Sequence, residues 1–405
     1  MVMLRRRIWL SIVLVSIISA GVEGRTLLSK EEEDEEIEQQ LKALNKPALK
    51  TIKTEHGDII DCVDIYKQPA FDHPLLKNHT IQMEPSSFPE ELKRQGTPLS
   101  SSNFMKMKLR GTSCPRGTVP IPRIQKEDLI RLKSLSQRKE AYFNSNNDDN
   151  STQIADCNIQ AHPNKSFSGG SALFSVYNPI LTSKDEYSAT TLWVQNFNDE
   201  QYNSIEVGWT VDPVLYGDSI TRLYTRWTAD SGRRARTGCY NILCPGFVQV
   251  GPYPVSQVLL PIIHDPHGGS VLDVVVFKDI KTKNWWFARP ESKTAIGYWP
   301  ASLFNIMKDE AHRIAWGGQA YSPKDDGGVE MGSGLFLSKQ ELKTCFAAKL
   351  QFVDETNHYM NPSPYKVETY TSNPNCYGVE YRGYTGPALE FDVLFGGPGG
   401  LKCRK

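Results

Sequence analysis

In the segment YNSIEVGWTV, residues 202–211, apolar and polar side chains alternate in the manner of a β-strand, and the expected fold is built outward from it. Alternation puts Ile205, Val207 and Trp209 on one face of the strand and leaves Glu206 and Gly208 on the other. Glutamate is depleted from strands and is rarely buried without a partner. A lone carboxylate beside a glycine therefore predicts a face that lines a cleft, where Gly208 leaves room for a ligand. A half-exposed strand with one solvated acid is the alternative.

Short segments of the same kind fill the chain from residue 171 onward, and turn residues separate them. They cover residues 190–195, 222–228, 246–250, 271–278, 285–289, 294–299, 314–321, 347–354, 377–381 and 389–395. Many short strands at this spacing predict an all-β domain, either an antiparallel two-sheet β-sandwich or a barrel. Within this part of the chain only residues 300–309 are expected to be helical.

Residues 25–164 have a different pattern and predict a smaller, mixed α/β region. A helix is expected at 30–44, where acidic residues occupy the first turns and suit the helix dipole. A strand is expected at 57–66 and a second helix at 125–138. The polar, turn-rich segment at 144–151 predicts a linker, the kind of segment where proteolysis concentrates.

Residues 1–24 predict a secretory signal peptide. Arginines at positions 5–7 precede an apolar run at 8–18 and small residues at 19–21. The run is too short to span a bilayer, and no later segment reaches ~18 consecutive apolar residues. We therefore expect a secreted protein, extracellular or in a vacuolar lumen, with no membrane contact after signal removal. Lys and Arg together number 46, as do Asp and Glu, so no basic excess indicates a nucleic-acid partner.

Secretion agrees with the glycosylation sequons at Asn78, Asn150 and Asn164. The chain has eight cysteines and no CxxC pair, which in an oxidising compartment predicts disulfides rather than a metal site. The segment HDPHGG at 264–269 contains two histidines, but its Pro and Gly favour a loop. The basic run RRAR at 233–236 is either a convertase-type cleavage site or a hairpin tip. We expect no metal and no cofactor.

Both halves of the chain contain distinctive motifs. The N-terminal half has DCVDIYKQPAFDHPLL at 61–76. The C-terminal half has IEVGW at 205–209, YGD at 216–218, TGCYNILC at 237–244, GYWP at 297–300, WGG at 316–318, MGSG at 331–334 and FGGPGG at 395–400. The first segment resembles part of the activation peptide of the neprosin family of secreted plant proteins, and the others resemble the peptidase domain of that family. In this order and spacing the motifs cover nearly the whole chain beyond the signal peptide.

The resemblance implies a secreted zymogen, with residues 25–164 as the activation peptide and 165–405 as a peptidase domain. That domain would be an antiparallel, jelly-roll-like β-sandwich that cleaves peptides after proline, with two Glu residues and no metal or cofactor. The first Glu falls on Glu206. The second falls within residues 314–319, where the candidate positions carry Ala315 and Gln319 instead. The neighbours expected to bind substrate are Gly208, Trp209, Trp316 and Gly317.

A peptidase without a covalent nucleophile needs one carboxylate to take a proton from water and a second group to stabilise the oxyanion. Gln319 can donate an amide hydrogen but cannot deliver a proton, an arrangement similar to the Glu and Gln pair of the fungal glutamic peptidases. If residues 314–321 form an unbroken strand, Ala315, Gly317 and Gln319 share one face. We expect this face and the Glu206 face to form one trough, with weak peptidase activity at acid pH that depends on Glu206 and Gln319.

The resemblance also implies disulfides, Cys62 with Cys114, Cys239 with Cys244, and Cys376 with Cys403. Whether Cys157 and Cys345 join is open. The activation peptide is expected to cover the Glu206 face as an intramolecular inhibitor of a monomeric enzyme that acts on peptide or protein substrates.

A catalytically inactive relative that binds peptide or glycan in the same trough is the alternative function, because aromatic residues on a sheet also stack on sugars. The residue that faces Glu206 distinguishes the two functions. A carboxyl or amide group there favours the enzyme, and an apolar side chain favours the binding protein.

Overall fold

The computed structural model describes residues 30–91, 105–106, 113–131, 152–231, 237–259, 270–290, 292–323, 328–337 and 343–400. Several sequence features lie outside the described residues: the expected signal peptide at 1–24, the linker at 144–151, Asn150, the segments 233–236 and 264–269, and Cys403. Within the described part, no helix is long and apolar enough to cross a membrane.

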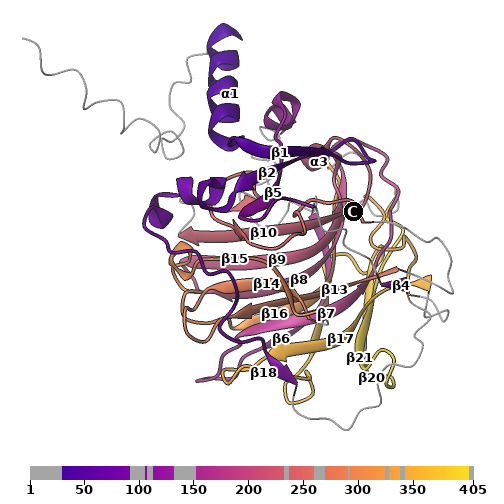
Figure 1. Cartoon of the computed structure of the whole chain (residues 1–405). Helices are drawn as coiled ribbons and strands as arrows, with labels where there is room; N and C mark the ends of the chain where they lie inside the picture. Colours follow the sequence, from indigo (N-terminus) through magenta and orange to yellow (C-terminus); the bar gives the residue numbers. More distant parts are fainter. Residues whose placement is uncertain are drawn as a thin grey trace, which may run out of the picture.

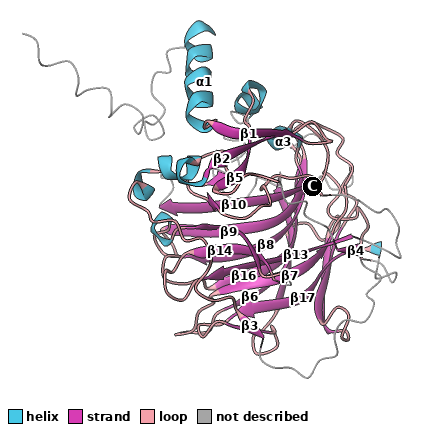
Figure 2. Ribbon diagram, in the orientation of Figure 1, coloured by secondary structure: helices cyan, strands magenta, loops and turns pink. Residues whose placement is uncertain are grey.

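Two large β-sheets pack face to face, which confirms the expected all-β sandwich (Figures 1 and 2). The seven-stranded sheet contains, in spatial order, β11 (Cys239–Tyr240), β10 (Arg222–Ser231), β9 (Gln201–Val211), β8 (Tyr187–Phe197), β16 (Arg313–Tyr321), β6 (Thr152–Gln160) and β19 (Glu368–Thr371). Every neighbouring pair in this sheet is antiparallel.

The second sheet has eleven strands and includes pieces of the N-terminal region. Its main path is β12 (Val248–Gln249), β15 (Thr294–Trp299), β14 (Trp285–Arg289), β13 (Ser270–Lys278), β7 (Gly169–Ser175), β17 (Cys345–Val353), β18 (His358–Met360) and β3 (Glu90–Glu91). β21 (Phe391–Gly396) pairs with β17 and with β20 (Gly378–Tyr384). The N-terminal strands β3 and β4 (Met105–Lys106) pair in parallel with β18 and β13.

Alternating side chains fill the space between the two sheets. On β9, Ile205, Val207 and Trp209 are fully buried, as the period of the sequence predicts. The indole of Trp209 donates a hydrogen bond to the carbonyl of Ser175 on β7 at 2.9 Å, and the indole of Trp316 on β16 donates to Ser171 at 3.0 Å. These indoles connect one sheet to the other, so the residues that alternate with them, such as Glu206 on β9 and Gln319 on β16, face outward.

Part of the N-terminal region forms a smaller unit at one edge of the sandwich (Figure 1). Helix α1 (Lys30–Leu44) precedes a three-stranded sheet of β1 (Ala48–Lys53), β2 (Ile59–Asp64) and β5 (Thr118–Pro122). Three short helical turns follow β2: η1 (Ile65–Lys67), η2 (Pro69–Asp72) and η3 (Pro74–Leu76). These elements confirm the helix at 30–44 and the strand near 57–66. Residues 126–131 are also helical, and the rest of the expected helix at 125–138 lies outside the described residues.

Two expectations need correction. Strand β6 falls within residues 25–164, yet it pairs with β16 and β19 inside the seven-stranded sheet, so the sandwich already includes Thr152 rather than beginning at 165. The pattern does not predict β6 because Gln153, Asp156 and Asn158 are polar types that strands usually avoid. The helix expected at 300–309 is only the turn η4 (Ala301–Leu303).

The cysteines follow the expected pairing where both partners are described. Cys62 bonds to Cys114, and Cys239 bonds to Cys244. Cys376 is disulfide-bonded, but its expected partner Cys403 lies outside the described residues. Cys157 on β6 and Cys345 on β17 are buried free thiols, which answers the question the sequence left open. The sequon residues Asn78 and Asn164 are exposed.

Candidate functional site

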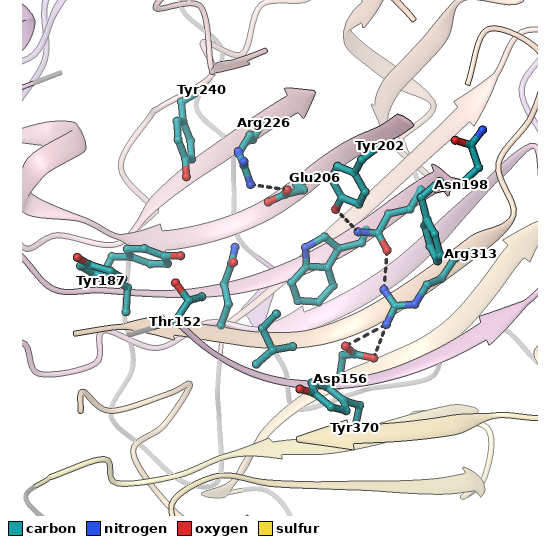
Figure 3. A pocket seen from close by; sticks show the side chains of 16 residues that line it. Thr152, Asp156, Tyr187, Asn198, Tyr202, Glu206, Arg226, Tyr240, Arg313 and Tyr370 are labelled. Atoms are coloured by element: carbon teal, nitrogen blue, oxygen red, sulfur yellow. Dashed lines mark hydrogen bonds and ion pairs between the residues drawn. The ribbon is translucent and has the colours of Figure 1, made fainter. Parts of the chain in front are cut away.

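A cleft of about 450 Å³ lies on the outer face of the seven-stranded sheet (Figure 3). Both Glu206 and Gln319 line it, as the parity of their strands predicts. Aromatic side chains contribute much of the wall, including Tyr187, Trp193, Tyr202, Tyr240, Tyr321 and Tyr370. The cleft therefore combines ionisable groups with flat apolar surfaces.

Strand register places Glu206 in a row that crosses the sheet. Its partner on β10 is Arg226, and its partner on β8 is Trp193. Trp193 in turn pairs with Ala315 on β16. Two apolar side chains thus continue the row beyond Glu206. Gln319 follows Ala315 on the same face of β16, roughly 13 Å further along the strand at ~3.3 Å per residue.

Glu206 and Arg226 form a buried ion pair. Arg226 Nη1 donates to Glu206 Oε1 at 2.8 Å, and the two side chains are 14% and 2% exposed. Burial alone would lower the pKa of Arg226, but the Glu206 carboxylate raises that pKa well above its usual value. The second carboxylate oxygen, Oε2, is also buried and accepts no hydrogen bond from the described residues. This oxygen is therefore the open acceptor of the site.

Tyr224 connects the Glu206 row to Gln319. Its hydroxyl lies 2.5 Å from Thr191 Oγ1 and accepts a hydrogen bond from Gln319 Nε2 at 3.2 Å. Burial raises the pKa of Tyr224 well above its usual value, and the charge of Glu206 raises it further. The hydroxyl therefore keeps its proton. Gln319 lines the cleft, and the buried phenol of Tyr224 lies directly behind its side-chain amide.

A second charged network lies at the other side of the cleft (Figure 3). Arg313 Nη2 donates to both carboxylate oxygens of Asp156, at 2.9 and 3.1 Å, and Nη1 donates to Gln195 Oε1 at 2.5 Å. Gln195 Nε2 donates to the hydroxyl of Tyr202 at 2.6 Å. Because the positive charge of Arg313 is paired with the negative charge of Asp156, the network as a whole is neutral. It therefore offers hydrogen-bonding groups to a ligand without favouring a ligand of either charge. Among the described residues, no group of three or more His, Cys, Asp or Glu side chains is arranged to hold a metal ion.

The neighbours expected to bind substrate are placed differently. Trp209 and Trp316 point into the core and are fully buried, so neither indole can stack on a ligand in the cleft. Gly208 and Gly317 face the cleft side, but an added Cβ would lie 1.9 Å from the carbonyl oxygen of Thr190 and 2.1 Å from that of Ala155. These glycines therefore allow close approach of neighbouring strands.

Gly208 has a second structural role. It lies directly between Tyr224 on β10 and Thr191 on β8 in the strand register. Because the hydroxyl of Tyr224 reaches Thr191, its ring must cross the strand that carries Gly208. The room expected for a ligand at Gly208 is thus used by Tyr224.

Several functional candidates were not predicted from the sequence, namely Trp193, Tyr224, Arg226, Arg313 and Asp156. A signal for two of them exists in β10, where Arg222, Tyr224 and Arg226 alternate with buried Leu223 and Trp227. The same parity that selects Glu206 would have selected them. The pairing of Arg226 with Glu206 needs the strand register, which the sequence does not contain.

The described part of the N-terminal region does not cover the Glu206 face, contrary to expectation. None of residues 30–91, 105–106 or 113–131 lines the cleft. Phe71 and Phe88 instead pack on the outer face of the eleven-stranded sheet, and Asp58 pairs with Arg222 near the β10 edge. Among the described residues, direct occlusion of the cleft is therefore not the way this region acts.

Comparison with known families identifies both halves of the chain. The family model for Neprosin matches residues 184–398, and that for the Neprosin activation peptide matches residues 51–166. The fold and these matches define a peptidase-like zymogen with an intramolecular pro-domain. The chain belongs to the neprosin family.

Solved structures with a similar course of the chain were also found. Scytalido-glutamic peptidase with a transition state analog inhibitor is 8% identical, with a TM-score of 0.32, over 61% of this chain and 98% of that chain. The same peptidase with a peptide-based analog is 10% identical, with a TM-score of 0.31 and the same coverage. A β-porphyranase from the human gut bacterium Bacteroides plebeius is 9% identical, with a TM-score of 0.24, over 41% of this chain and 54% of that chain.

Proposed function

We propose that this chain is the precursor of a secreted glutamic endopeptidase that cleaves peptides after proline, with Glu206 and Gln319 as its catalytic residues. The observation that carries the proposal is the open, buried Oε2 of Glu206 in the same cleft as Gln319, whose side-chain amide donates to the buried hydroxyl of Tyr224. A buried carboxylate oxygen without a partner has an unmet need for a hydrogen-bond donor. A water molecule bound there would meet this need and would be positioned for attack.

Glu206 is the proposed base. Its carboxylate takes a proton from this water as the water oxygen bonds to the carbonyl carbon of the substrate. The carbonyl electrons move to the oxygen and form an oxyanion. When the bond between carbon and nitrogen breaks, the protonated Glu206 returns the proton to the leaving amine. One carboxyl group can therefore serve both steps.

Gln319 and Tyr224 are the proposed donors to the oxyanion. The amide N–H and the phenol O–H are fixed by each other and by Thr191, and fixed donors stabilise developing charge at no cost of reorganisation. Removing one such donor typically costs ~100- to 1,000-fold in rate. Gln319 thus has a role that does not require it to titrate.

The proline preference is proposed from family membership and from the wall next to Glu206. Trp193 is the cross-strand neighbour of Glu206 on the cleft floor. A flat indole beside the attacking group suits an apolar pyrrolidine ring. Ala315, the next residue in the row, leaves the far edge of the indole uncrowded.

A second candidate function is the binding of peptide or glycan without cleavage. Two observations favour it: Arg226 occupies one oxygen of Glu206, and the residues that continue its row are apolar. The stacked rings of Tyr187 and Tyr321, 5.6 Å apart, add a flat wall near Gln319. In this case Arg226 and Glu206 would be a structural pair.

Substitution of Glu206 separates the two functions. The full chain, activated at acid pH, would be tested on peptides that contain a single proline. We expect Glu206→Gln to lower kcat by ~100- to 10,000-fold, the usual contribution of general base catalysis. Glu380→Gln, at an exposed position on β20, is the matched control and should leave the rate unchanged.

Gln319 provides the second comparison. Gln319→Ala should lower the rate, whereas Gln319→Glu should raise it because a titrating group can share the proton transfer. Ala315→Glu tests the other candidate position. Cleavage that is unchanged in Glu206→Gln would remove Glu206 from the reaction. If the unaltered protein binds these peptides without cleaving them, the enzyme proposal is wrong and the binding function replaces it.

A further inference from the structure

The outer face of the eleven-stranded sheet has an apolar part that covers β13, β14 and β15. On β13, Val274 and Val276 point into the core, while Val275 and Phe277 point outward, and all four are essentially buried. A strand in an antiparallel sheet with one wet face would alternate between apolar and polar residues. Continuous apolar runs such as this one indicate burial on both faces.

The adjacent strands repeat the pattern. Trp286 on β14 and Tyr298 on β15 point outward with Phe277, and their rings lie 4.6 Å apart. All three side chains are fully buried. Apolar patches of this kind are rare on the surface of soluble proteins unless something covers them.

The cover is a segment of the N-terminal region, residues 68–91, which we call the strap (Figure 1). Ala70, Phe71 and Phe88 pack on this apolar face. The ring of Phe88 lies 5.5 Å from that of Phe277. The strap therefore supplies the third layer of this part of the fold.

Polar contacts hold the strap in register with the sheet. The side chain of Gln68, which is 1% exposed, pairs with the main chain of Gln249 on β12. Its oxygen accepts from the Gln249 amide at 2.7 Å, and its nitrogen donates to the Gln249 carbonyl at 3.1 Å. These two hydrogen bonds replace those that a neighbouring strand would make, so both the N–H and the C=O of Gln249 at the edge of the sheet are satisfied.

The far end of the strap is fixed in the same way. Asn357 Nδ2 donates to the carbonyl of Phe88 at 3.1 Å, and the amide of Glu90 donates to the Asn357 carbonyl at 2.9 Å. Between the ends, the Tyr298 hydroxyl accepts from the Gln82 amide at 3.0 Å. The strap is thus anchored along its whole length by contacts that a flexible tether would not make.

A buried ion pair fastens the three-stranded sheet to the sandwich as well. Both terminal nitrogens of Arg222 donate to the carboxylate of Asp58 at 3.0 Å, and the Arg222 side chain is only 4% exposed. Arg222 also bonds to Asp218 of its own domain. The pairing with Asp58 therefore joins the two parts of the chain at a second, independent place.

We infer that the strap and the three-stranded sheet stay bound to the sandwich after the chain is cut between Arg131 and Thr152, so that the processed protein is a non-covalent assembly of two chains. Two facts support this. Departure of the strap would expose Phe277, Trp286 and Tyr298 together, and its described residues do not line the cleft. The strap therefore does not have to leave for a substrate to reach the cleft. The partner that fits this apolar face is the N-terminal segment of the same chain.

The test is to cut the full chain at one place without denaturing it. A recognition sequence for a specific protease replaces residues 144–151, and the cut protein is analysed at neutral pH by size-exclusion chromatography with light scattering and by intact mass. We expect both fragments to co-elute at the mass of the uncut chain. Separation into a free N-terminal fragment and a folded, monomeric sandwich would overturn the inference. A sandwich that instead dimerises would overturn it too, with a second copy as the partner.

A matched pair of variants locates the interaction. Phe88→Glu places a charge against Phe277, and Met83→Glu changes a strap residue that is 54% exposed. After the cut, Phe88→Glu should lose most of its N-terminal fragment and bind an apolar dye, whereas Met83→Glu should behave as the unaltered protein. Should Phe88→Glu fail to fold, a urea titration of the cut, unaltered protein decides. Release of the strap together with unfolding of the sandwich supports the inference, and release well before unfolding overturns it.

Discussion

The two sheets of this sandwich present opposite chemistry on their outer faces. On the seven-stranded sheet, Glu206, Arg226 and Gln319 alternate with core residues and line a cleft. On the eleven-stranded sheet, Phe277 and Trp286 alternate with core residues that are equally apolar, and the strap covers them. In this protein, polar alternation therefore accompanies the face that carries the cleft, whereas strands that are apolar on both sides form the face that another part of the chain covers.

Substitutions on the two outer faces should also destabilise the protein for different reasons. A charge on the cleft face is stable only with its partner, because a buried charge left alone costs far more than the pair contributes. An apolar side chain under the strap needs no particular partner, but its loss leaves a cavity. The largest effects on stability should therefore come from the covered face, and the most specific ones from the cleft.

The largest change in stability is expected from Trp286→Ala. Trp286 is fully buried beneath the strap, so the substitution should lower the free energy of unfolding by about 3–5 kcal/mol. Urea unfolding of the full chain measures it. Tyr384→Ala, at a position that is 59% exposed on β20, is the control and should change the free energy of unfolding by less than ~0.5 kcal/mol. A loss below ~1 kcal/mol for Trp286→Ala would show that this face is not packed as described.

Much of the sandwich is predictable because its strands alternate. Each segment expected to be a strand after residue 171 overlaps an observed one, including β8, β9 and β16. Strand β6 is not predicted because the polar residues Gln153, Asp156 and Asn158 interrupt its apolar positions, as they would in a loop. The three-layer arrangement over β13 is not predicted either, since a continuous apolar run does not say which segment covers its second face.

The site is predictable in part for the same reason. Parity places Glu206 and Gln319 on one outer face, and both line the cleft. Parity also puts Trp209 and Trp316 in the core, so their expected contact with substrate conflicts with the strand period and is wrong. The pairing of Glu206 with Arg226 depends on which residues of β9 and β10 are opposite each other, and that register is a tertiary property.

A smaller effect is expected from the ion pair in the cleft. Arg226→Met should lower the free energy of unfolding by about 3 kcal/mol, the lower end of the usual cost, because Glu206 would remain buried without a counterion. The double variant Arg226→Met with Glu206→Gln should recover most of this loss, since no charge is then left unpaired. Urea unfolding of the two single variants and the double variant gives the coupling energy. Additive losses would mean that the two side chains do not depend on each other.

The smallest effect concerns the pH dependence of strap binding. His79 lies in the strap with its ring nitrogen Nε2 2.8 Å from the Tyr298 hydroxyl, and burial lowers the pKa of His79 from its usual 6.5. The groups around it are Phe71, Gln82 and Tyr298, and burial raises the pKa of Tyr298 to about 12, so Tyr298 is uncharged at neutral pH. The bound strap therefore holds the neutral imidazole, with no carboxylate among these contacts to stabilise its charged form.

The sign of the effect follows from proton linkage. A released strap would bind a proton near pH 6.5 more readily than the bound strap, so binding is strongest above pH 6.5 and weakens as the pH falls below it. The rate at which a protease digests the strap in the cut protein, measured from pH 7.5 to 5.5, reports this change. His79→Gln keeps a hydrogen bond to Tyr298 without a titrating group and should reduce the slope of the profile, whereas His56→Gln, at an exposed position outside the strap, should not. His73 is half-buried in the strap, and partial burial lowers its pKa, so His79→Gln should retain a residual slope that disappears when His73→Gln is added. A profile that keeps its full slope in the double variant would place the pH dependence elsewhere and would remove His79 from the binding of the strap.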